Sequence, residues 1–307
     1  MFYVSISFRV FLYVFFIAAT AMAEVKKEFG EFLVTHSEKT STQIIVNRHY
    51  SSRSLYKGVF GFNWCSDLDY KISVNDKTVP EEMSLFDCEL GKRITFKRTS
   101  PSRFENFENQ LKLTVKDHQI QYEKSTTTYF FSMDGRLSHW TATSSLDPIY
   151  VIYKDGHMLR LMGKKMGLVD LKISGDGLIL KIGTEFSYEY NQGLLRKVLQ
   201  SKKTLWQYQY DEFLNMTLWR SPSSFESMKY DSEWDRIVEL KDKEDCRFTF
   251  QYEIKKSKKY ILESKKCVAT VEHETVFEMV SPRMLIQSNS DKLGKEFRQE
   301  GKNENVF

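Results

Sequence analysis

The stretch YQYDEFLNMTLW, residues 208–219, has the pattern of a strand, a turn and a second strand. Its tyrosines and tryptophan favour strands, whereas the Asp-Glu-Phe-Leu-Asn in the middle is typical of a turn. A single segment of this kind predicts an ordinary β-hairpin. Related segments precede and follow it along the chain, so the fold depends on whether the pattern is a repeat.

Apolar and aromatic residues recur at alternate positions in segments spaced about twenty residues apart. Side chains two residues apart point the same way from a strand, so each set forms a stripe on one face. The sets are Phe186/Tyr188/Tyr190, Trp206/Tyr208/Tyr210, Met228/Tyr230 and Phe248/Phe250/Tyr252. Upstream, Asp-Gly pairs follow strand-like runs at 134–135, 155–156 and 176–177, with a spacing of 21 both times.

Such a period suits two strands joined by tight turns, which is one hairpin. Because a lone hairpin is marginally stable, we expect the hairpins to line up edge to edge. We therefore predict an all-β fold in which repeated hairpins at 129–280 form a continuous curled antiparallel sheet. A lead-in at 24–40 and a β region at 41–128 would precede them, and a polar tail at 281–307 would follow. Strands are also regularly spaced in a β-sandwich, but that fold does not explain why tyrosine recurs at the same position in successive units.

The hairpin units resemble YD repeats, in which Tyr-Asp precedes a short turn and a second strand. Tyr210-Asp211 and Tyr230-Asp231 carry the pair, and Tyr190-Asn191 and Tyr252-Glu253 differ from it in the second residue. Gly193 corresponds to the glycine of the YD-repeat turn, although it lies one residue earlier than in that pattern. Leu214 and Trp234 occupy the glycine position in the next two units.

A second resemblance lies at 43–72, QIIVNRHYSSRSLYKGVFGFNWCSDLDYKI. This stretch is similar to the segment that opens the YD-repeat region in Rhs-family proteins. The matching residues are Arg48, Tyr50, Ser52, Gly58, Gly61 and Trp64, whereas Asn63 stands where glycine is common. Together the two resemblances cover roughly residues 41–280.

The resemblance implies a long β-sheet that spirals into a hollow shell. Such shells enclose a C-terminal toxin in bacterial polymorphic toxins and serve adhesion or display in other surface proteins. A complete toxin would have a self-cleavage motif and a further domain after the repeats. Here Asp147-Pro148 lies mid-chain and only 281–307 follows. The resemblance therefore implies a partial shell, either a truncated remnant or one piece of a split system, with an open sheet edge for a protein partner.

The first 23 residues predict a secretory signal. Arg9 precedes an apolar core at Val10–Ala19, and the small-residue ending Ala21-Met22-Ala23 predicts cleavage after Ala23. The core is short for a bilayer span, so a permanent anchor is the weaker alternative. We expect an exported chain without a membrane span after cleavage, located in the periplasm, on the cell surface or in the medium.

Export makes disulfides the natural use of an even number of cysteines. Four cysteines allow three connectivities, and the local one, Cys65–Cys88 with Cys246–Cys267, has separations of 23 and 21 residues. Each separation is about one out-and-back hairpin, which would bring its two cysteines close together. A metal site is the rival, but no Cys-x-x-Cys or nearby histidine pair supports it.

Motifs for chemistry are few. The net charge of +4 is low and dispersed, which argues against a nucleic-acid partner. The chain has no zinc signature, nucleophile elbow, phosphate loop or calcium loop. His273 lies between Glu272 and Glu274, but neighbours in a strand face opposite sides. We predict no catalytic residue, cofactor or metal, and a non-enzymatic scaffold with a structural or protein-interaction role.

The alternative is a secreted or surface adhesin that binds carbohydrate. Aromatic residues are 14% of the chain, and sugars stack on exposed rings, although most rings here should form the apolar face of the sheet. Trp219 is the exception, because strand alternation places it opposite Met216 and Leu218 and predicts a glycan contact. A hydrolase is a third class, and it would need paired acidic residues in a deep pocket.

Overall fold

The structure is a computed structural model that describes residues 20–27, 29–74, 80–88, 91–142, 145–154, 157–255, 258–268, 273–281 and 284–288. Within these ranges the chain is all-β, and one 3-10 turn, η1 (Asp67–Asp69), is the single helical element. The predicted fold class is confirmed, because repeated hairpins form one continuous antiparallel sheet. Asp-Gly turns occur at 134–135 and 176–177, whereas the pair at 155–156 lies outside the described residues.

The large sheet has 22 strands in the described part of the chain. In chain order they are β7 (Ile72–Val74), β8 (Glu82–Asp87), β9 (Lys92–Ser100), β10 (Arg103–Asn106), β11 (Leu111–Lys116), β12 (Gln119–Lys124), β13 (Thr127–Ser132), β14 (Leu137–Ala142), β15 (Ser145–Lys154), β16 (His157–Gly163), β17 (Gly167–Ile173), β18 (Ile179–Ile182), β19 (Phe186–Asn191), β20 (Leu194–Gln200), β21 (Lys203–Tyr210), β22 (Met216–Arg220), β23 (Phe225–Tyr230), β24 (Ile237–Asp242), β25 (Arg247–Lys255), β26 (Lys258–Lys266), β27 (His273–Ser281) and β28 (Met284–Ser288). Each strand pairs with its sequence neighbours, and β7 and β28 are the ends of an open sheet, since no ladder joins them in the described residues.

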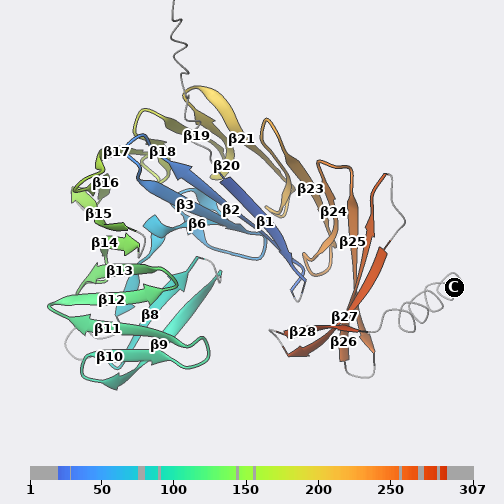
Figure 1. Cartoon of the computed structure of the whole chain (residues 1–307), viewed down its shortest axis with the longest axis horizontal. Coiled ribbons are helices and arrows are strands. Elements are labelled where there is room, and N and C mark those ends of the chain that lie inside the picture. Colours follow the sequence, from blue (N-terminus) through green and yellow to red (C-terminus); the bar gives the residue numbers. More distant parts are fainter. Residues whose placement is uncertain are drawn as a thin grey trace, which may run out of the picture.

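A second, four-stranded sheet lies on the inner side of the arc that the large sheet forms (Figure 1). It consists of β1 (Thr20–Lys26), β2 (Glu31–Lys39), β3 (Ile45–Ser51) and β6 (Trp64–Ser66). The two-residue strands β4 (Lys57–Gly58) and β5 (Gly61–Phe62) form a small hairpin between β3 and β6. We call residues 29–70 the inner segment.

The inner segment changes the domain boundaries that the sequence predicts. Residues 24–40, expected to be a lead-in, contain the last three residues of β1 and all of β2, and the inward side chains of β2 are buried. Residues 41–128, expected to open the large sheet, are split between the inner sheet and the strands that begin at β7. Residues 284–288 of the expected tail form β28. Residues 1–19 lie outside the described residues, and the expected cleavage after Ala23 falls within β1.

A β-bulge recurs in the hairpin units. In each unit two consecutive residues of one strand pair with two residues of the next strand. Those two partners are not consecutive, because one extra residue lies between them. The extra residues are Ser138, Leu159, Leu180, Arg196, Thr217 and Val238, which are 21 apart except for the interval of 16 between Leu180 and Arg196. A bulge bends its strand and raises the local twist, so a regular series of bulges accounts for the curvature of the sheet.

One apolar core fills the space between the inner segment and the large sheet. It is rich in aromatic rings, and Trp64 of β6 packs edge-on against Tyr208 of β21 at 5.1 Å between ring centres. At the far end of the sheet the core is thin, where Leu262 and Val276 form a separate small cluster with Tyr260. The hydrophobic contribution to stability is therefore concentrated where the inner segment lies against the hairpins.

Candidate functional site

The six motif residues predicted from 43–72 all belong to the inner segment and are buried. Arg48 on β3 is fully buried and donates to Glu38 Oε1 on β2 from both Nε and Nη2, the Nε contact at 2.8 Å. Its Nη2 also donates to the Tyr208 hydroxyl at 3.3 Å. Three rings surround the guanidinium carbon, with ring centres at 4.7 Å for Trp64, 5.3 Å for Phe60 and 5.6 Å for Tyr188.

The charges of this pair depend on each other. Burial alone would lower the pKa of Arg48, but the charge and hydrogen bond of Glu38 outweigh it and hold that pKa well above its usual value. Burial raises the pKa of Glu38, and the charge of Arg48 partly offsets this. Since each charge lies out of water, removing either partner would leave the other unpaired in the core.

The remaining motif side chains also contact the hairpins or support the inner segment. The Tyr50 hydroxyl accepts from the Met216 amide at 2.7 Å, and Trp64 Nε1 donates to the Tyr210 hydroxyl at 2.9 Å. Ser52 Oγ accepts from the Phe32 amide at 3.0 Å and so joins the end of β3 to the start of β2. These contacts make the motif a packing element between the two sheets.

The two motif glycines allow close backbone approach. Gly61 has φ of +100°, and a β-carbon there would lie 2.3 Å from the carbonyl oxygen of Gly193. A β-carbon on Gly58 would lie 2.4 Å from the carbonyl oxygen of Trp64. Both distances are far below van der Waals contact, so any larger residue would push the inner segment away from the turn or from itself.

Successive hairpins bind the inner segment at equivalent positions. The amide just before the bulge residue donates to the inner segment in three units: Ile179 to Val59 O at 2.8 Å, Met216 to the Tyr50 hydroxyl and Ile237 to Gly30 O at 2.8 Å. A bulge interrupts the ladder and leaves amides that need another partner. In these three units the inner segment supplies that partner.

The repeat-signature residues stabilise the hairpins themselves. Tyrosine hydroxyls donate to the backbone of the preceding unit, from Tyr190 to Ile179 O at 2.8 Å, from Tyr230 to Met216 O at 3.0 Å and from Tyr252 to Ile237 O at 2.9 Å. Asp211 accepts from the amides of Phe213 and Asn215, and Asp231 accepts from those of Glu233 and Trp234. The tyrosines therefore fasten neighbouring units together, and the aspartates close the turns.

A group of unpaired polar atoms lies in the same buried region. Among the described residues His36 of β2 has no hydrogen-bond partner on either ring nitrogen, and its ring centre lies 4.2 Å from that of Trp206. Tyr188 Oη and Trp206 Nε1 are also buried without a partner. Burial, with a smaller contribution from the charge of Arg48, holds the pKa of His36 well below its usual value. His36 is therefore neutral in the folded chain near neutral pH.

The four cysteines form the two local pairs that the sequence predicts. Cys65 pairs with Cys88, with Cα atoms 5.3 Å apart, and Cys246 pairs with Cys267 at 4.1 Å. The first bridge joins the end of the inner segment to β8, whereas the second closes the turn at β25 onto the end of β26.

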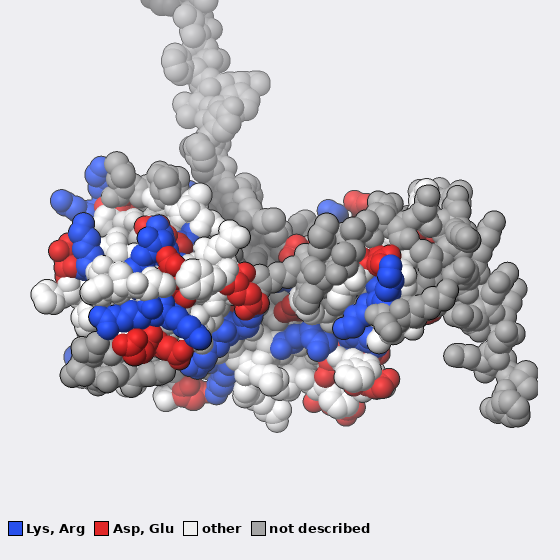
Figure 2. All heavy atoms as spheres, turned by 90° about the horizontal axis from the view of Figure 1, so that it is seen from below, with Lys and Arg blue, Asp and Glu red and all other residues white. Residues whose placement is uncertain are grey.

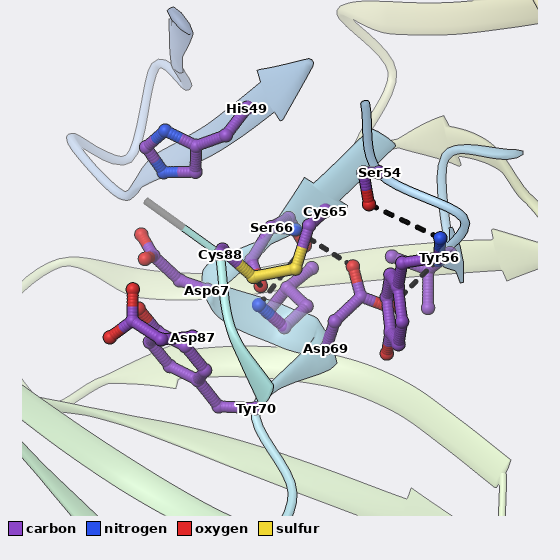
Figure 3. The surroundings of a disulfide bond; sticks show 12 residues. His49, Ser54, Tyr56, Cys65, Ser66, Asp67, Asp69, Tyr70, Asp87 and Cys88 are labelled. Atoms are coloured by element: carbon purple, nitrogen blue, oxygen red, sulfur yellow. Dashed lines mark hydrogen bonds between the residues drawn. A yellow bond between two sulfur atoms is a disulfide. The ribbon is translucent and has the colours of Figure 1, made fainter. Parts of the chain in front are cut away.

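Three aspartates surround the first bridge, as Figure 3 shows. Asp67 accepts from Asn47 and from the Tyr129 hydroxyl, and Asp87 accepts from Lys124 and from the Tyr122 hydroxyl. Asp69 accepts from the amides of Val59 and Ser66, and burial raises its pKa to about 7. Each carboxylate thus has partners that belong to the fold.

One group of side chains has metal-ligand spacing in the described residues, namely Asp242, Glu244 and Cys246. The sulfur of Cys246 is bonded to Cys267, and the Asp242 side chain accepts hydrogen bonds from the amides of Glu244 and Cys246. This arrangement is a closed turn beside a disulfide. It offers no open set of ligands for a cation.

A groove of about 460 Å³ lies where the inner segment meets the strands β25 to β27. We call it the 234 groove, and its lining residues are Phe29, Arg53, Trp234, Arg236, Tyr252, Glu253, Ile254, Lys259, Tyr260, Ile261 and Met279. Trp234 is 57% exposed and Ile254 is 72% exposed. Arg53 Nη1 donates to Phe29 O at 3.3 Å and to Trp234 O at 2.9 Å, so the inner segment and a repeat turn meet here.

The predicted glycan contact at Trp219 is wrong. Trp219 is only 4% exposed, and its Nε1 donates to Glu226 at 3.0 Å within the core. The bulge at Thr217 adds a residue between Met216 and Trp219, so both side chains point inward. Trp234 was the missed residue; its one signal in the sequence is a large aromatic ring at the glycine position of a repeat turn.

Charged side chains do not separate by sign on the face shown in Figure 2, where basic patches are bordered by acidic ones. No helix in the described residues has the length and apolar character needed to cross a membrane. No family model and no curated protein matches the chain.

Proposed function

We propose that this chain is an exported, non-enzymatic β-scaffold of the Rhs/YD-repeat type, with a structural or protein-interaction role. The observation that carries the proposal is the set of hydrogen bonds that the amides of Ile179, Met216 and Ile237 donate to the inner segment. A chain built in this way holds a curved sheet in one shape. Tyr50, one of the motif residues that resemble the Rhs family, accepts one of these hydrogen bonds, and Arg48 and Trp64 donate to hairpin tyrosines beside it.

The placement of the buried charged groups supports a scaffold over a hydrolase. Glu38 is paired with Arg48, Asp87 with Lys124, and Asp67 with Asn47 and Tyr129. A glycosidase needs two carboxyl groups that face a substrate across a cleft. In this chain these buried carboxylates support the packing of the inner segment, and we assign them no catalytic role.

Export is supported by the signal-like first 23 residues and by two disulfides, which persist in oxidising compartments. The test is expression of the full chain in a secretion-competent host, followed by mass spectrometry of the exported protein. The proposal expects an N-terminus at Glu24 and no free thiols. An intact N-terminus with reduced cysteines, recovered inside the cell, would contradict it.

The partner in this proposal is a protein strand that pairs with the open edge at β28. In the described residues β28 pairs with β27 alone, and an unpaired edge offers backbone donors and acceptors to another chain. Lysine-reactive crosslinking of the exported chain tests this. We expect intermolecular crosslinks from Lys258 and Lys259 of β26, the described strand nearest to this edge that contains lysine; crosslinks confined to the chain itself would contradict a protein partner.

Carbohydrate binding is the second candidate function, and the exposed ring of Trp234 in the 234 groove favours it. The test is binding of the mature chain, residues 24–307, to a broad glycan panel. Saturable binding that Trp234→Ala abolishes would favour the adhesin. An absence of binding to every glycan would contradict it and leave the scaffold.

A further inference from the structure

The 234 groove combines exposed apolar surface with positive charge. Trp234 and Ile254 supply exposed apolar faces, and Phe29 lies at the edge of the groove with 44% of its surface exposed. Arg53, Arg236 and Lys259 also line it, and among the described lining residues Glu253 is the acidic one. The volume of about 460 Å³ is within the range of small-ligand sites.

The three cations differ in how much they are already used. Arg236 donates from Nε to Asp231 at 2.9 Å and stacks over Tyr252 at 4.6 Å, so its charge is largely balanced. Arg53 uses Nη1 for two carbonyl oxygens, and neither bond removes its charge. Lys259 is exposed and has no ion-pair partner among the residues that the structure describes. The groove therefore has a surplus of positive charge.

The position of Arg53 is fixed relative to the tryptophan. Its guanidinium donates to Trp234 O at 2.9 Å and to Phe29 O at 3.3 Å, which joins the cation to the turn that carries the ring. A guanidinium edge binds a carboxylate with two parallel hydrogen bonds, and only Nη1 is occupied by these carbonyls. An aromatic face beside a fixed guanidinium suits a ligand that has both a flat apolar face and a carboxylate.

We propose that the 234 groove binds a carboxylated sugar, whose ring stacks on Trp234 and whose carboxylate binds Arg53, with Lys259 adding charge. This inference rests on the carbohydrate-binding candidate above and specifies its ligand class. A neutral sugar would satisfy the tryptophan but not the surplus charge. An acidic peptide would satisfy the charge, and it is one outcome of the test.

The experiment measures binding of the oxidised mature chain to matched oligosaccharides by calorimetry. The probes are tetramers of a hexuronic acid, the same tetramers as methyl esters, sialylated oligosaccharides with their desialylated forms, and a poly-glutamate peptide. We expect the free acid of at least one pair to bind at least tenfold more tightly than its neutral counterpart. The affinity should fall as salt rises, because the contact is ionic.

Four variants locate the site. Trp234→Ala should weaken binding more than tenfold, and Lys259→Gln should weaken it severalfold and reduce the salt dependence. Arg53→Lys keeps the charge but loses the planar fork, so it should also weaken binding. Phe213→Ala, an exposed aromatic in the turn of the preceding repeat unit, is the matched control and should bind like the wild type. Melting temperatures of all variants report whether the fold is intact.

Each contrary outcome has a distinct meaning. Equal binding of acid and neutral forms would overturn the carboxylate inference and leave carbohydrate binding standing. Acid-specific binding that Trp234→Ala and Lys259→Gln leave unchanged would remove the site from this groove. Binding of poly-glutamate alone would replace the sugar with a peptide. Binding of none of the probes would overturn this inference, whereas the broad glycan panel decides the adhesin candidate.

Discussion

Hairpins from β18 to β25 share the main core with the inner segment, whereas β26 to β28 lie at the end of the arc (Figure 1). The first group contributes Trp206, Tyr208 and Trp219 to the main core. In the second group Leu262 and Val276 form a small cluster of their own. The link from the second group to the β1–β2 turn includes Lys27, which pairs with Glu263.

The difference shows what a curved sheet of hairpins needs. Its concave face is apolar, and hairpins alone cannot remove that face from water. The inner segment fills the curve and completes the hydrogen bonds that the bulges leave open. Where it does not reach, the chain has the disulfide Cys246–Cys267 instead. Stability should therefore be uneven along the sheet.

The largest expected effect comes from the buried ion pair. Arg48→Ala leaves Glu38 without its partner in the core, and we expect a loss of about 3–5 kcal/mol in the free energy of unfolding. Arg160→Ala breaks the partly exposed pair with Asp170 and should cost less than about 1 kcal/mol. Urea unfolding of both variants measures the difference. Equal losses would contradict a special role for the inner segment.

The two tryptophans of neighbouring repeat units should behave in opposite ways. Trp219→Ala opens a cavity in the core and should cost about 3–5 kcal/mol, whereas Trp234→Ala changes an exposed side chain and should cost less than about 1 kcal/mol. Thermal and urea unfolding provide the measurement. A small effect at Trp219 would mean that the bulge does not turn its side chain inward.

The disulfides test the comparison directly. Replacing both cysteines of either pair with serine opens a loop of 21 or 23 residues, which is worth about 3 kcal/mol. For Cys246 and Cys267 we expect faster hydrogen exchange in β25 and β26, with the main core unchanged. For Cys65 and Cys88 we expect faster exchange across both sheets. The same local pattern in both variants would contradict uneven support.

Stability should also depend on pH through His36. Its pKa is lowered by burial in the folded chain, and the unfolded chain has the ordinary value near 6.5. Below about pH 6.5 the unfolded state therefore binds more protons, and the free energy of unfolding falls as the pH falls. His36→Phe should reduce this dependence between pH 7.5 and 5.5. An unchanged dependence in the variant would show that His36 is not its source.

The smallest effect concerns the turn at Leu214, whose φ of +69° is unusual for leucine. Glycine adopts this conformation freely, so Leu214→Gly should change stability by less than about 1 kcal/mol, with relief of strain offset by chain entropy. Gly61→Ala should cost more, because a β-carbon there meets the Gly193 carbonyl. Comparing the two melting temperatures tests this order.

Much of the fold could be predicted from local pattern. The hairpin period, the Asp-Gly turns and the cysteine spacing each depend on residues close in sequence, and the structure has the continuous sheet and both local disulfides. The strand β2 was missed because two of its inward residues, His36 and Glu38, are polar. Their burial depends on Arg48 and on aromatic rings far away in sequence, which no local pattern reveals.

The candidate site was less predictable. Trp219 was assigned outward by simple alternation, and one bulge residue, Thr217, reverses that assignment. The 234 groove brings together Arg53 and Trp234, which are 181 residues apart. Their proximity follows from the position of the inner segment against the hairpins, so it could only be found once the fold was known.

The most direct test of the central claim is native-state hydrogen exchange of the oxidised chain by mass spectrometry. If the inner segment supports the hairpins, β2, β3 and β18 to β25 should exchange together at the slowest rates, and β26 to β28 should open earlier as a separate unit. Arg48→Ala should raise the exchange rates of the first group of strands to nearly those of the second group. Uniform exchange along the whole sheet, unchanged by Arg48→Ala, would contradict the claim.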